Sequence, residues 1–592
     1  MESVEDELES DIRDVGQWKR VVGALFSVRA QRLSDERQPW MDLDADAQAR
    51  ISSDIDQQLQ ANAFTIAALM TDKLPTISRE RWAFQRNERW FEVSIAARRA
   101  TWKHVKDLPG PDESIPLLWI VRQHFRIAGV THMVPYNVST METHLGICSQ
   151  YQKKGIYRFY VGNTLHVIIF KPQLIESVLT SQKTMSKSFN YSLLHSWLGT
   201  GLLTSSGTKW KQRRRMLTPA FHFRILEDFV APMNEHARNM VKRISRFLES
   251  DETDVVPFLA ACTLAILLET IMGVTTGKYN EDIGSYIAAI KYLTEQVVAR
   301  SQTPWLQLDS IYLRTDAGRE YKRRVSVVHN FTKKVIGDRR EELVRERRTV
   351  HAVSTNDDEF REKRRLTFID ILLHHSLDFE ALLKDEDIRE EVDTFMFEGH
   401  DTTTMAVAWC LYLIGLHRQV QTKVQEELDD VLREQPDRNI TPEDMKKLKY
   451  MDCVIKESQR LCPAVPFIGR TATEELKLGG HTIPEGTNIG LVLYVLHRNP
   501  DVFPRPEEFD PDRFLPENSA TRHPFAFIPF SAGSRNCIGQ KFASMEIKII
   551  LGHVLRSFSL QSVDPRDKLL MTVDAVLRTA NGLKIKFIPR VS

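Results

Sequence analysis

The sequence has few of the features that mark secreted, zinc-binding or nucleic-acid-binding proteins. Its 592 residues include only 6 cysteines, and no two of them have C-x-x-C spacing. This argues against zinc sites and disulfide frameworks and fits a reducing compartment. The formal net charge is +1, so the chain lacks the strong positive charge of many nucleic-acid binders. The opening residues, MESVEDELES, are acidic where a signal peptide is basic and apolar.

An uninterrupted membrane-spanning run is also missing. The most apolar stretch, residues 255–274 (VVPFLAACTLAILLETIMGV), is nearly long enough to cross a bilayer. Pro257 near its start, and Glu269 with Thr270 near its end, make spanning costly. We therefore predict a buried core helix here.

Composition divides the chain into two predicted parts. Residues 1–92 are acidic and then mixed, and two interpretations stay open for them. They form an N-terminal extension of unknown role, or a segment that binds a partner or nucleic acid through RERWAFQRNERWFE. Residues 93–592 form the main domain, in which IYRFYVGNTLHVIIF predicts a β-hairpin that turns at Gly162-Asn163.

One cysteine, Cys537, stands in a glycine-containing loop just before a predicted helix. A lone cysteine beside a helix is more often a small buried hydrophobe. The N–H groups and the dipole of a helix N-terminus, however, stabilise the thiolate that binds metal. Gly533 and Gly539 allow a flat cofactor to approach the backbone, and Arg535 suits a cofactor carboxylate.

The whole pattern of this loop, Phe-x-x-Gly-x-Arg-x-Cys-x-Gly, resembles the haem-binding loop of the cytochrome P450 monooxygenases. It is matched by Phe530, Gly533, Arg535, Cys537 and Gly539. The resemblance covers roughly residues 95–592 and implies the cytochrome P450 fold, which is mainly α-helical with a small β-rich subdomain. It implies that Cys537 ligates the iron of haem b, and that Phe530, Arg535 and Gly539 bind the haem.

A second motif lies in the predicted helix that starts at Asp385, where polar residues interrupt an otherwise apolar pattern. Read alone, Thr402 bonds back to a helix carbonyl and Asp401 is a satisfied buried acid. Next to a haem iron, the same acid and alcohol would be catalytic and relay protons to bound dioxygen. Gly399 would leave space for the dioxygen.

The thirteen residues 391–403, EVDTFMFEGHDTT, closely resemble the oxygen-activation helix of family-4 P450s, the fatty-acid ω-hydroxylase group that includes insect members. Family members with glutamate at the position of Glu398 can form an ester to a haem methyl group. The alternative is that the Glu398 carboxylate only hydrogen-bonds or stays unreacted.

Three other segments gain predicted roles from the resemblance. Trp210 and Arg214, four residues apart on one helix face, and Arg470 hold the haem propionates. The remaining basic residues of that helix form a docking surface for an acidic electron donor: Lys209, Lys211, Arg213 and Arg215. The stretch DAVLRTANGLKIKF near the C-terminus forms a hairpin that closes the substrate pocket.

The Glu-x-x-Arg pair, Glu457 and Arg460, is predicted to be buried with Arg513 and to lock the cysteine loop to the core. Its role is structural. Cys462 is predicted to be packing, and residues 465–467 line the substrate.

The predicted function is insertion of one atom of O2 into a C–H bond of a fatty acid, hormone or xenobiotic. NADPH–cytochrome P450 reductase, with cytochrome b5 as a further partner, supplies electrons at the cytosolic face of the endoplasmic reticulum. The expected membrane contact is peripheral, and no nucleic acid is expected. Two alternatives stay open: a haem-thiolate isomerase or dehydratase that needs no reductase, and an interaction or nucleic-acid protein driven by residues 1–92.

Overall fold

The computed structural model describes residues 108–110, 145–161, 164–248, 250, 252–353, 366–377, 383–433, 435 and 437–590. All of them fall in one compact unit, Ser94–Ser592. The predicted extension 1–92 and the predicted turn at Gly162-Asn163 lie outside the described residues.

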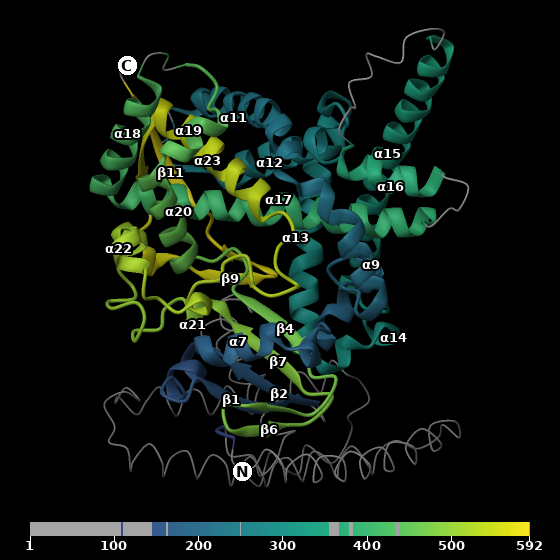
Figure 1. Ribbon diagram of the computed structural model, residues 1–592, viewed down its shortest axis with the longest axis vertical. Coiled ribbons are helices and arrows are strands. Elements are labelled where there is room, and N and C mark those ends of the chain that lie inside the picture. The colour runs from purple at the N-terminus through teal and green to yellow at the C-terminus, as the bar shows by residue number, and fades with distance from the viewer. Residues whose placement is uncertain are drawn as a thin grey trace, which may run out of the picture. The chain divides into compact units, whose positions relative to one another are not determined.

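The described part is mainly helical (Figure 1). The helices before the centre of the fold are α7 (Pro172–Thr180), α8 (His195–Leu198), α9 (Gly207–Leu217), α10 (Phe223–Leu226), α11 (Val230–Ile244), α12 (Val256–Thr270), α13 (Asn280–Gln302), α14 (Asp309–Tyr312), α15 (Asp316–Val353) and α16 (Phe368–Leu377). They are followed by α17 (Asp385–Leu416), α18 (Arg418–Leu432), α19 (Pro442–Lys447), α20 (Lys449–Leu461), α21 (Leu493–Leu496), α22 (Pro516–Ser519) and α23 (Gln540–Ser557).

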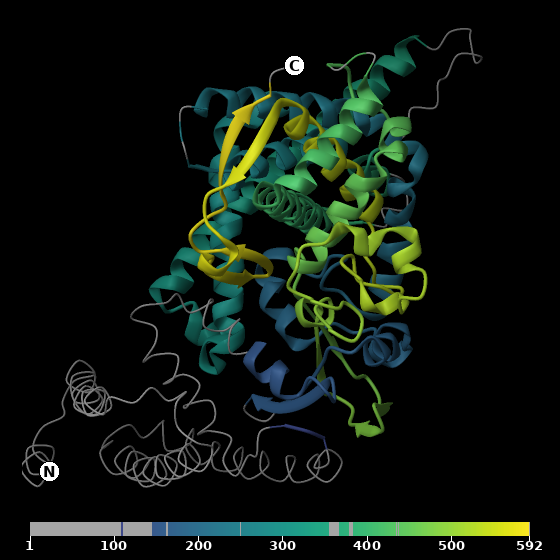
Figure 2. The same ribbon diagram turned by 90° about the vertical axis from the view of Figure 1, so that its left-hand side faces the viewer.

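Helix α17 is the axis of the helical part; it crosses the middle of Figure 1 and is seen nearly end-on in Figure 2. Asp385, Glu386 and Asp387 occupy its first turn, where negative charge suits the helix dipole. The stretch 403–414 is buried on every side, as expected of a helix that is apolar all round. Helices α12, α15, α20 and α23 all pack against α17.

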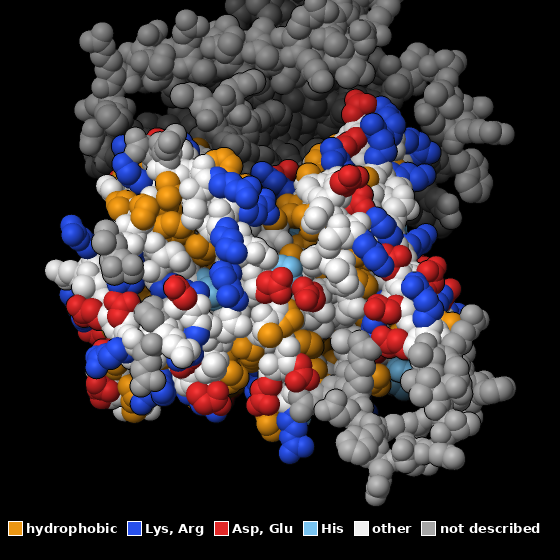
Figure 3. Space-filling view, turned by 90° about the horizontal axis from the view of Figure 1, so that it is seen from above, with side chains coloured by type: hydrophobic (Ala, Val, Ile, Leu, Met, Phe, Trp, Pro, Cys, Tyr) orange, Lys and Arg blue, Asp and Glu red, His pale blue; other side chains and the backbone are white. Residues whose placement is uncertain are grey.

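The apolar run at 255–274 forms α12, which begins with Pro257 in its first turn. Most of its side chains are buried, so the predicted core helix is confirmed. Among the described residues, no helix combines the length and the apolar character needed to cross a membrane. The face of the molecule in Figure 3 intersperses Lys and Arg with Asp and Glu, in keeping with the balanced charge.

Within the described residues, the β structure is small and divided among four sheets. The largest has the order β1-β2-β7-β4, in which only the β2–β7 pair is parallel. The predicted strand pair is confirmed, because β1 and β2 are antiparallel and pair Ile156 with Ile169. The strands are β1 (Ile156–Val161), β2 (Thr164–Ile169), β3 (Thr253–Asp254), β4 (Phe467–Thr471), β5 (Leu476–Leu478), β6 (His481–Ile483), β7 (Asn488–Val492), β8 (Phe558–Ser562), β9 (Met571–Asp574), β10 (Val576–Thr579) and β11 (Lys584–Pro589).

The predicted pairing at the C-terminus is wrong. Strand β10 pairs with β9 across a tight turn at Ala575, and β11 pairs instead with β8 and β3. The sequence misled because Asn581-Gly582 is a typical turn signal, whereas Ala575 adopts a φ of 69° without being glycine. A hairpin exists here, but it spans residues 571–579.

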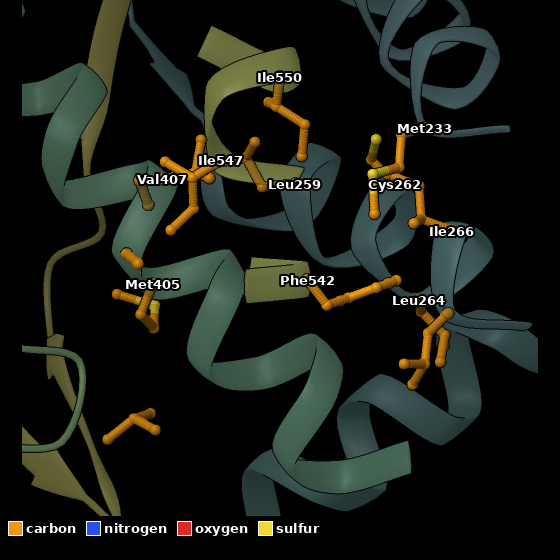
Figure 4. Close-up of a cluster of buried hydrophobic side chains, with 14 of the residues drawn as sticks. Met233, Leu259, Cys262, Leu264, Ile266, Met405, Val407, Phe542, Ile547 and Ile550 are labelled. Atoms are coloured by element: carbon orange, nitrogen blue, oxygen red, sulfur yellow. The ribbon is translucent and has the colours of Figure 1, made fainter. Parts of the chain in front are cut away.

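A buried acid lies in the core where α11, α12, α17 and α23 meet. Figure 4 shows the apolar side chains of this region, including Met233, Cys262 and Phe542. Glu546 of α23 is 0% exposed, and neither carboxylate oxygen has a hydrogen-bond partner in the part of the chain that the structure describes. Burial raises the pKa of Glu546 well above its ordinary value.

We expect the Glu546→Met variant to be more stable than wild type, by about 1–3 kcal/mol at pH 8, because an unsatisfied buried polar group is removed. The unfolded chain releases the Glu546 proton above a pKa of about 4.3, whereas the folded state retains it to higher pH. Wild type therefore loses stability as pH rises through this window, and the gain in the variant is smaller at pH 5. Unfolding monitored at both pH values measures this.

The matched control is Glu426→Met, the same change at an exposed position of α18. It should leave the pH dependence of stability unaltered. A Glu546→Met variant with the pH dependence of wild type would show that the acid is not held neutral in the core.

Candidate active site

The cysteine loop has a fixed backbone. The Cys537 N–H donates to the Phe530 carbonyl at 2.9 Å, and α23 begins at Gln540 with Gly539 as its N-cap. Gly533 has a φ of 72°, and a Cβ there would lie 2.2 Å from the Leu179 carbonyl oxygen. A side chain at 533 is therefore excluded both by conformation and by space.

The Cys537 sulfur faces a hollow inside the protein. Cys537 is the exposed cysteine of the six, yet burial raises the pKa of its thiol to about 11. A group that is accessible and also surrounded by protein lines an internal space. The thiolate stabilisation expected from the helix N-terminus does not dominate: the negative charge of Glu398 contributes to the raised pKa, and the Gly539 N–H and Arg214 offset only part of it.

A metal ion bound to Cys537 needs further ligands that come from a cofactor and not from a cluster of protein side chains. The described part of the chain contains no group of three His, Cys, Asp or Glu residues that could hold a metal ion. The iron of a porphyrin meets this condition, since four ligands come from the ring. Coordination to such a cation deprotonates a thiol outright, whatever its pKa in the free protein.

Glu398 and Thr402 face the same hollow from α17. The Glu398 side chain is accessible, burial raises its pKa to about 7, and its charge acts directly on the Cys537 thiol. Thr402 lies one turn further along the helix and donates its hydroxyl to the Glu398 carbonyl at 2.5 Å. The predicted oxygen-handling segment and the predicted iron ligand therefore oppose each other.

Positive charges crowd one side of the hollow. Burial, together with the charges of Arg470 and Arg214, lowers the pKa of Arg535 to about 10. Burial, followed by repulsion from Arg470 and Arg535, holds the pKa of Lys187 well below its ordinary value. The Arg535 guanidinium stacks 4.4 Å from the centroid of the Trp210 ring and donates to the Ser205 carbonyl at 2.5 Å.

The donors of Arg535 show that this site fits an anionic cofactor. Its Nε and Nη1 atoms are buried and have no hydrogen-bond partner among the described residues. Buried donors without acceptors beside mutually repelling cations are costly unless carboxylates join them. The two propionates of haem supply such groups. Of these cations, sequence reasoning missed Lys187, because KTMSKSFNY carries no recognisable pattern.

Arg214 is predicted to donate together with Trp210 to a propionate, and the structure gives it a contact that the sequence did not predict. Its Nη1 and Nη2 atoms donate to the carbonyl and side-chain oxygens of Asn536, at 2.7 and 2.8 Å. Arg214 therefore braces the residue before Cys537, while Trp210 supports Arg535. Arg470, which is also predicted to hold a propionate, is buried on β4, and its charge acts on Arg535.

Two of the four basic residues predicted to form a docking surface on α9 form ion pairs within the protein. Arg213 is buried and pairs with Asp387 at 2.5 Å, and Lys209 pairs with Glu390 at 2.8 Å. Both bind the acidic start of α17 and hold α9 against it. Lys211 and Arg215 remain exposed.

Gly399 of α17 differs from its predicted environment, whereas Asp401 is the satisfied buried acid that the helix read alone predicts. A Cβ on Gly399 would lie 2.7 Å from Cδ1 of Leu267, so this glycine permits a close crossing with α12 and does not open space for dioxygen. The Asp401 carboxylate is bound by Arg578 of β10, at 2.5 and 2.7 Å. Sequence reasoning did not single out Arg578, because its partner is 177 residues away in the chain.

The predicted Glu-x-x-Arg network is present. Glu457 and Arg460 are fully buried and joined by two hydrogen bonds of 2.7 and 2.8 Å, and Arg513 lies 3.5 Å from Glu457. Arg460 also donates to the carbonyls of His497, Pro506 and Glu508, and thus holds the segment that leads toward the cysteine loop.

The predicted substrate wall and the C-terminal hairpin are joined. The Leu577 N–H of β10 donates to the Ala464 carbonyl at 2.9 Å, next to the predicted wall, where Val465 and Phe467 are partly exposed. Cys462 is buried, and burial raises the pKa of its thiol to about 11, as expected of a packing residue.

Comparison with known proteins agrees with this geometry. Residues 130–587 match the family model described as cytochrome P450. The chain is 40% identical over 492 residues to human cytochrome P450 4V2, covering 83% of this chain and 91% of that one. It is 42% identical over 440 residues to Drosophila melanogaster cytochrome P450 4c3, covering 74% and 82% of the two chains. The chain therefore belongs to the cytochrome P450 family, is similar to its family 4, and is a haem-thiolate monooxygenase with the fold that the sequence predicted.

Proposed function

We propose that the protein hydroxylates a long lipophilic molecule: a fatty acid first, with hormones and xenobiotics as further candidates. The observation that carries the proposal is the opposition of Cys537 to Glu398 and Thr402 across one hollow bordered by unpaired cations. In the net reaction, substrate, O2, NADPH and a proton give hydroxylated substrate, water and NADP⁺. The bound haem supplies the activation of O2 and the attack on the C–H bond.

The residues divide this work among them. Cys537 holds the iron, and Phe530 and Gly539 fix the loop against the ring. Arg470, Arg535 and Lys187 receive the propionates, with Trp210 behind Arg535 and Arg214 behind the loop; their positions beside the hollow support these assignments.

Thr402 and Asp401 are the proposed proton-delivery pair. The Thr402 side chain is partly exposed on the hollow side of α17, where it can hold a water, and Asp401 is the residue before it in the helix. This pair favours a monooxygenase over the alternative isomerase or dehydratase, in which no proton has to reach bound oxygen.

Electrons are proposed to come from NADPH–cytochrome P450 reductase, with cytochrome b5 as a second donor. The exposed Lys211 and Arg215 of α9 suit an acidic partner. Peripheral attachment to the cytosolic face of the endoplasmic reticulum follows from the lipophilic substrate and from the likeness to family 4. The alternative of an interaction protein driven by residues 1–92 concerns a segment outside the described residues.

The iron ligand is tested by the carbon-monoxide difference spectrum of the reduced protein. Wild type should show a thiolate-type Soret band, and Cys537→Ala should lose it, because no other described cysteine lines the hollow. Cys462→Ala, at a buried cysteine, is the control and should keep the band. A band that survives in Cys537→Ala would refute the ligand assignment.

The substrate class is tested with a panel of saturated fatty acids of 10–22 carbons, an isoprenoid hormone and a planar aromatic xenobiotic. With reductase and NADPH, we expect a fatty acid to give the largest spectral shift and a product oxidised at or near the terminal methyl. The products are identified by mass spectrometry. Turnover of the xenobiotic alone, or product formation without reductase, would contradict the proposal.

We also propose that Glu398 forms an ester to a haem methyl, a two-electron oxidation of that methyl by the enzyme's own oxygen chemistry. The position of Glu398 opposite Cys537 supports it. After turnover and denaturing chromatography in acid, haem absorbance should elute with the wild-type polypeptide and separately from Glu398→Ala. Glu386→Ala, at an exposed acid of the same helix, is the control. Free haem from turned-over wild type would rule out the ester.

A further inference from the structure

One arginine of α9, Arg213, lies away from the surface that its basic neighbours form. Its side chain is only 7% exposed, whereas Lys211 and Arg215 of the same helix are exposed. Its Nη2 atom lies 2.5 Å from Oδ1 of Asp387, and its Nε atom lies 3.8 Å from Oε1 of Glu391. Both acids belong to the first two turns of α17. Arg213 therefore joins α9 to the start of the central helix.

Glu391 is the deeper of the two acids. It is 0% exposed, and its Oε2 atom accepts the Leu202 N–H at 3.0 Å. Burial raises the pKa of Glu391 to about 7 against the opposing effects of this N–H group and of Arg213. Removing Arg213 is therefore costly, because a buried acid would lose its nearby cation.

The chain that leads into α9 is held by the same turns of α17. Oε1 of Glu390 accepts the Thr200 N–H at 2.8 Å, and Oε2 of Glu390 pairs with Lys209 at 2.8 Å. A Cβ on Gly199 would lie 2.3 Å from Oε1 of Glu390, so the two segments touch without space for a side chain. Residues 199–206 and α9 are thus fixed together against α17.

The same segment and helix support the cysteine loop. The Ser205 carbonyl accepts from Arg535 at 2.5 Å, and the Trp210 ring lies 4.4 Å from the Arg535 guanidinium. Arg214 donates two hydrogen bonds to Asn536. These contacts hold the two residues that precede the proposed iron ligand, and α17 holds α9 in turn. A displacement of α9 would therefore reach the cysteine loop.

We propose that Arg213 is a positioning residue for the cysteine loop: it fixes α9 against α17, so that Arg535 and Asn536 keep their places beside Cys537. The inference rests on the proposed roles of Cys537 and Arg535 in binding the haem. It separates Arg213 from the docking of an electron donor, for which the exposed basic residues of α9 remain. Loss of the contact with α17 should loosen the loop and speed the loss of haem.

The test compares Arg213→Met, Arg213→Lys and the double variant Arg213→Met/Glu391→Met with wild type as haem-loaded enzymes. The first readout is the rate at which haem passes to an excess of apomyoglobin. The second is the share of the carbon-monoxide complex that shows the thiolate-type Soret band. The third is the concentration of reductase that gives half-maximal reduction of the iron by NADPH.

We expect Arg213→Met to lose haem at least about tenfold faster than wild type and to show a smaller share of the thiolate-type band, because a buried acid is left without its cation. Arg213→Lys should be intermediate, since it keeps the charge without the planar guanidinium. The double variant should lose haem more slowly than Arg213→Met, because an apolar pair replaces the uncompensated acid. In all three, the half-maximal reductase concentration should stay within about twofold of wild type, because Arg213 is not on the docking surface.

Arg215→Met is the matched control on the same helix. It should lose haem at the rate of wild type and need about threefold more reductase or higher, because it removes an exposed charge that suits an acidic partner. Arg339→Met is the control for losing a buried arginine as such, because Arg339 is 1% exposed and pairs with Asp370 at 2.8 Å, between α15 and α16. It should lower thermal stability and keep the wild-type rate of haem loss.

Haem loss at the wild-type rate in Arg213→Met, or equally fast loss in Arg339→Met, would overturn the inference while leaving the roles of Cys537 and Arg535 intact. Arg535→Met tests the underlying role separately: if it holds haem as firmly as wild type, the proposed role of Arg535 fails and this inference fails with it. If Arg213→Met takes up no haem, Arg213→Lys and the double variant decide between the same outcomes.

Discussion

The excess of positive charge inside the protein is the constraint on which the active site depends. Arg470 and Arg535 both lower the pKa of Lys187, and Arg470 also lowers the pKa of Arg535. Arg535 keeps two buried donors without partners among the described residues. Repelling cations in a low dielectric are unfavourable unless anions share the space. The fold holds these cations in place through its β4 strand and cysteine loop, so that binding a dianionic cofactor removes the repulsion. Cofactor binding and stability of this region are therefore linked.

Some turns of helix α17 have a structural role, and others take part in the chemistry. Its first turn is acidic and binds Lys209 and Arg213 of α9, and its last turns are buried on all sides. Only the middle faces the hollow, and there polar residues replace the apolar ones. Gly399 connects the two roles. Because it has no side chain, α12 crosses close to α17, and this crossing fixes the position of Glu398 and Thr402 relative to the hollow.

The features that could be predicted from the sequence are those that depend on short motifs. The cysteine loop, the Glu457–Arg460 pair, the long helix and the first strand pair all depend on residues within a few positions of one another, so spacing alone was enough. The sequence did not predict contacts between distant segments. Nothing in α9 reveals that Arg214 donates to Asn536, and Lys187 and Arg578 were missed for the same reason. The C-terminal pairing failed because Ala575 turns the chain without glycine.

The buried polar groups of this protein differ in their hydrogen-bond partners. Groups that bond to other protein groups have structural roles, and groups that lack protein partners have roles in cofactor binding and chemistry. Glu457 and Arg460 satisfy each other and the surrounding carbonyls, so they fix a single arrangement. Arg535 and Glu398 are not satisfied by the protein alone and face the hollow, where a cofactor completes them. Asp401 belongs to the first group, because Arg578 of β10 satisfies its carboxylate and the neighbouring Val576 and Leu577 are buried in the main hydrophobic core. Its contact with β10 therefore fixes the C-terminal hairpin against α17.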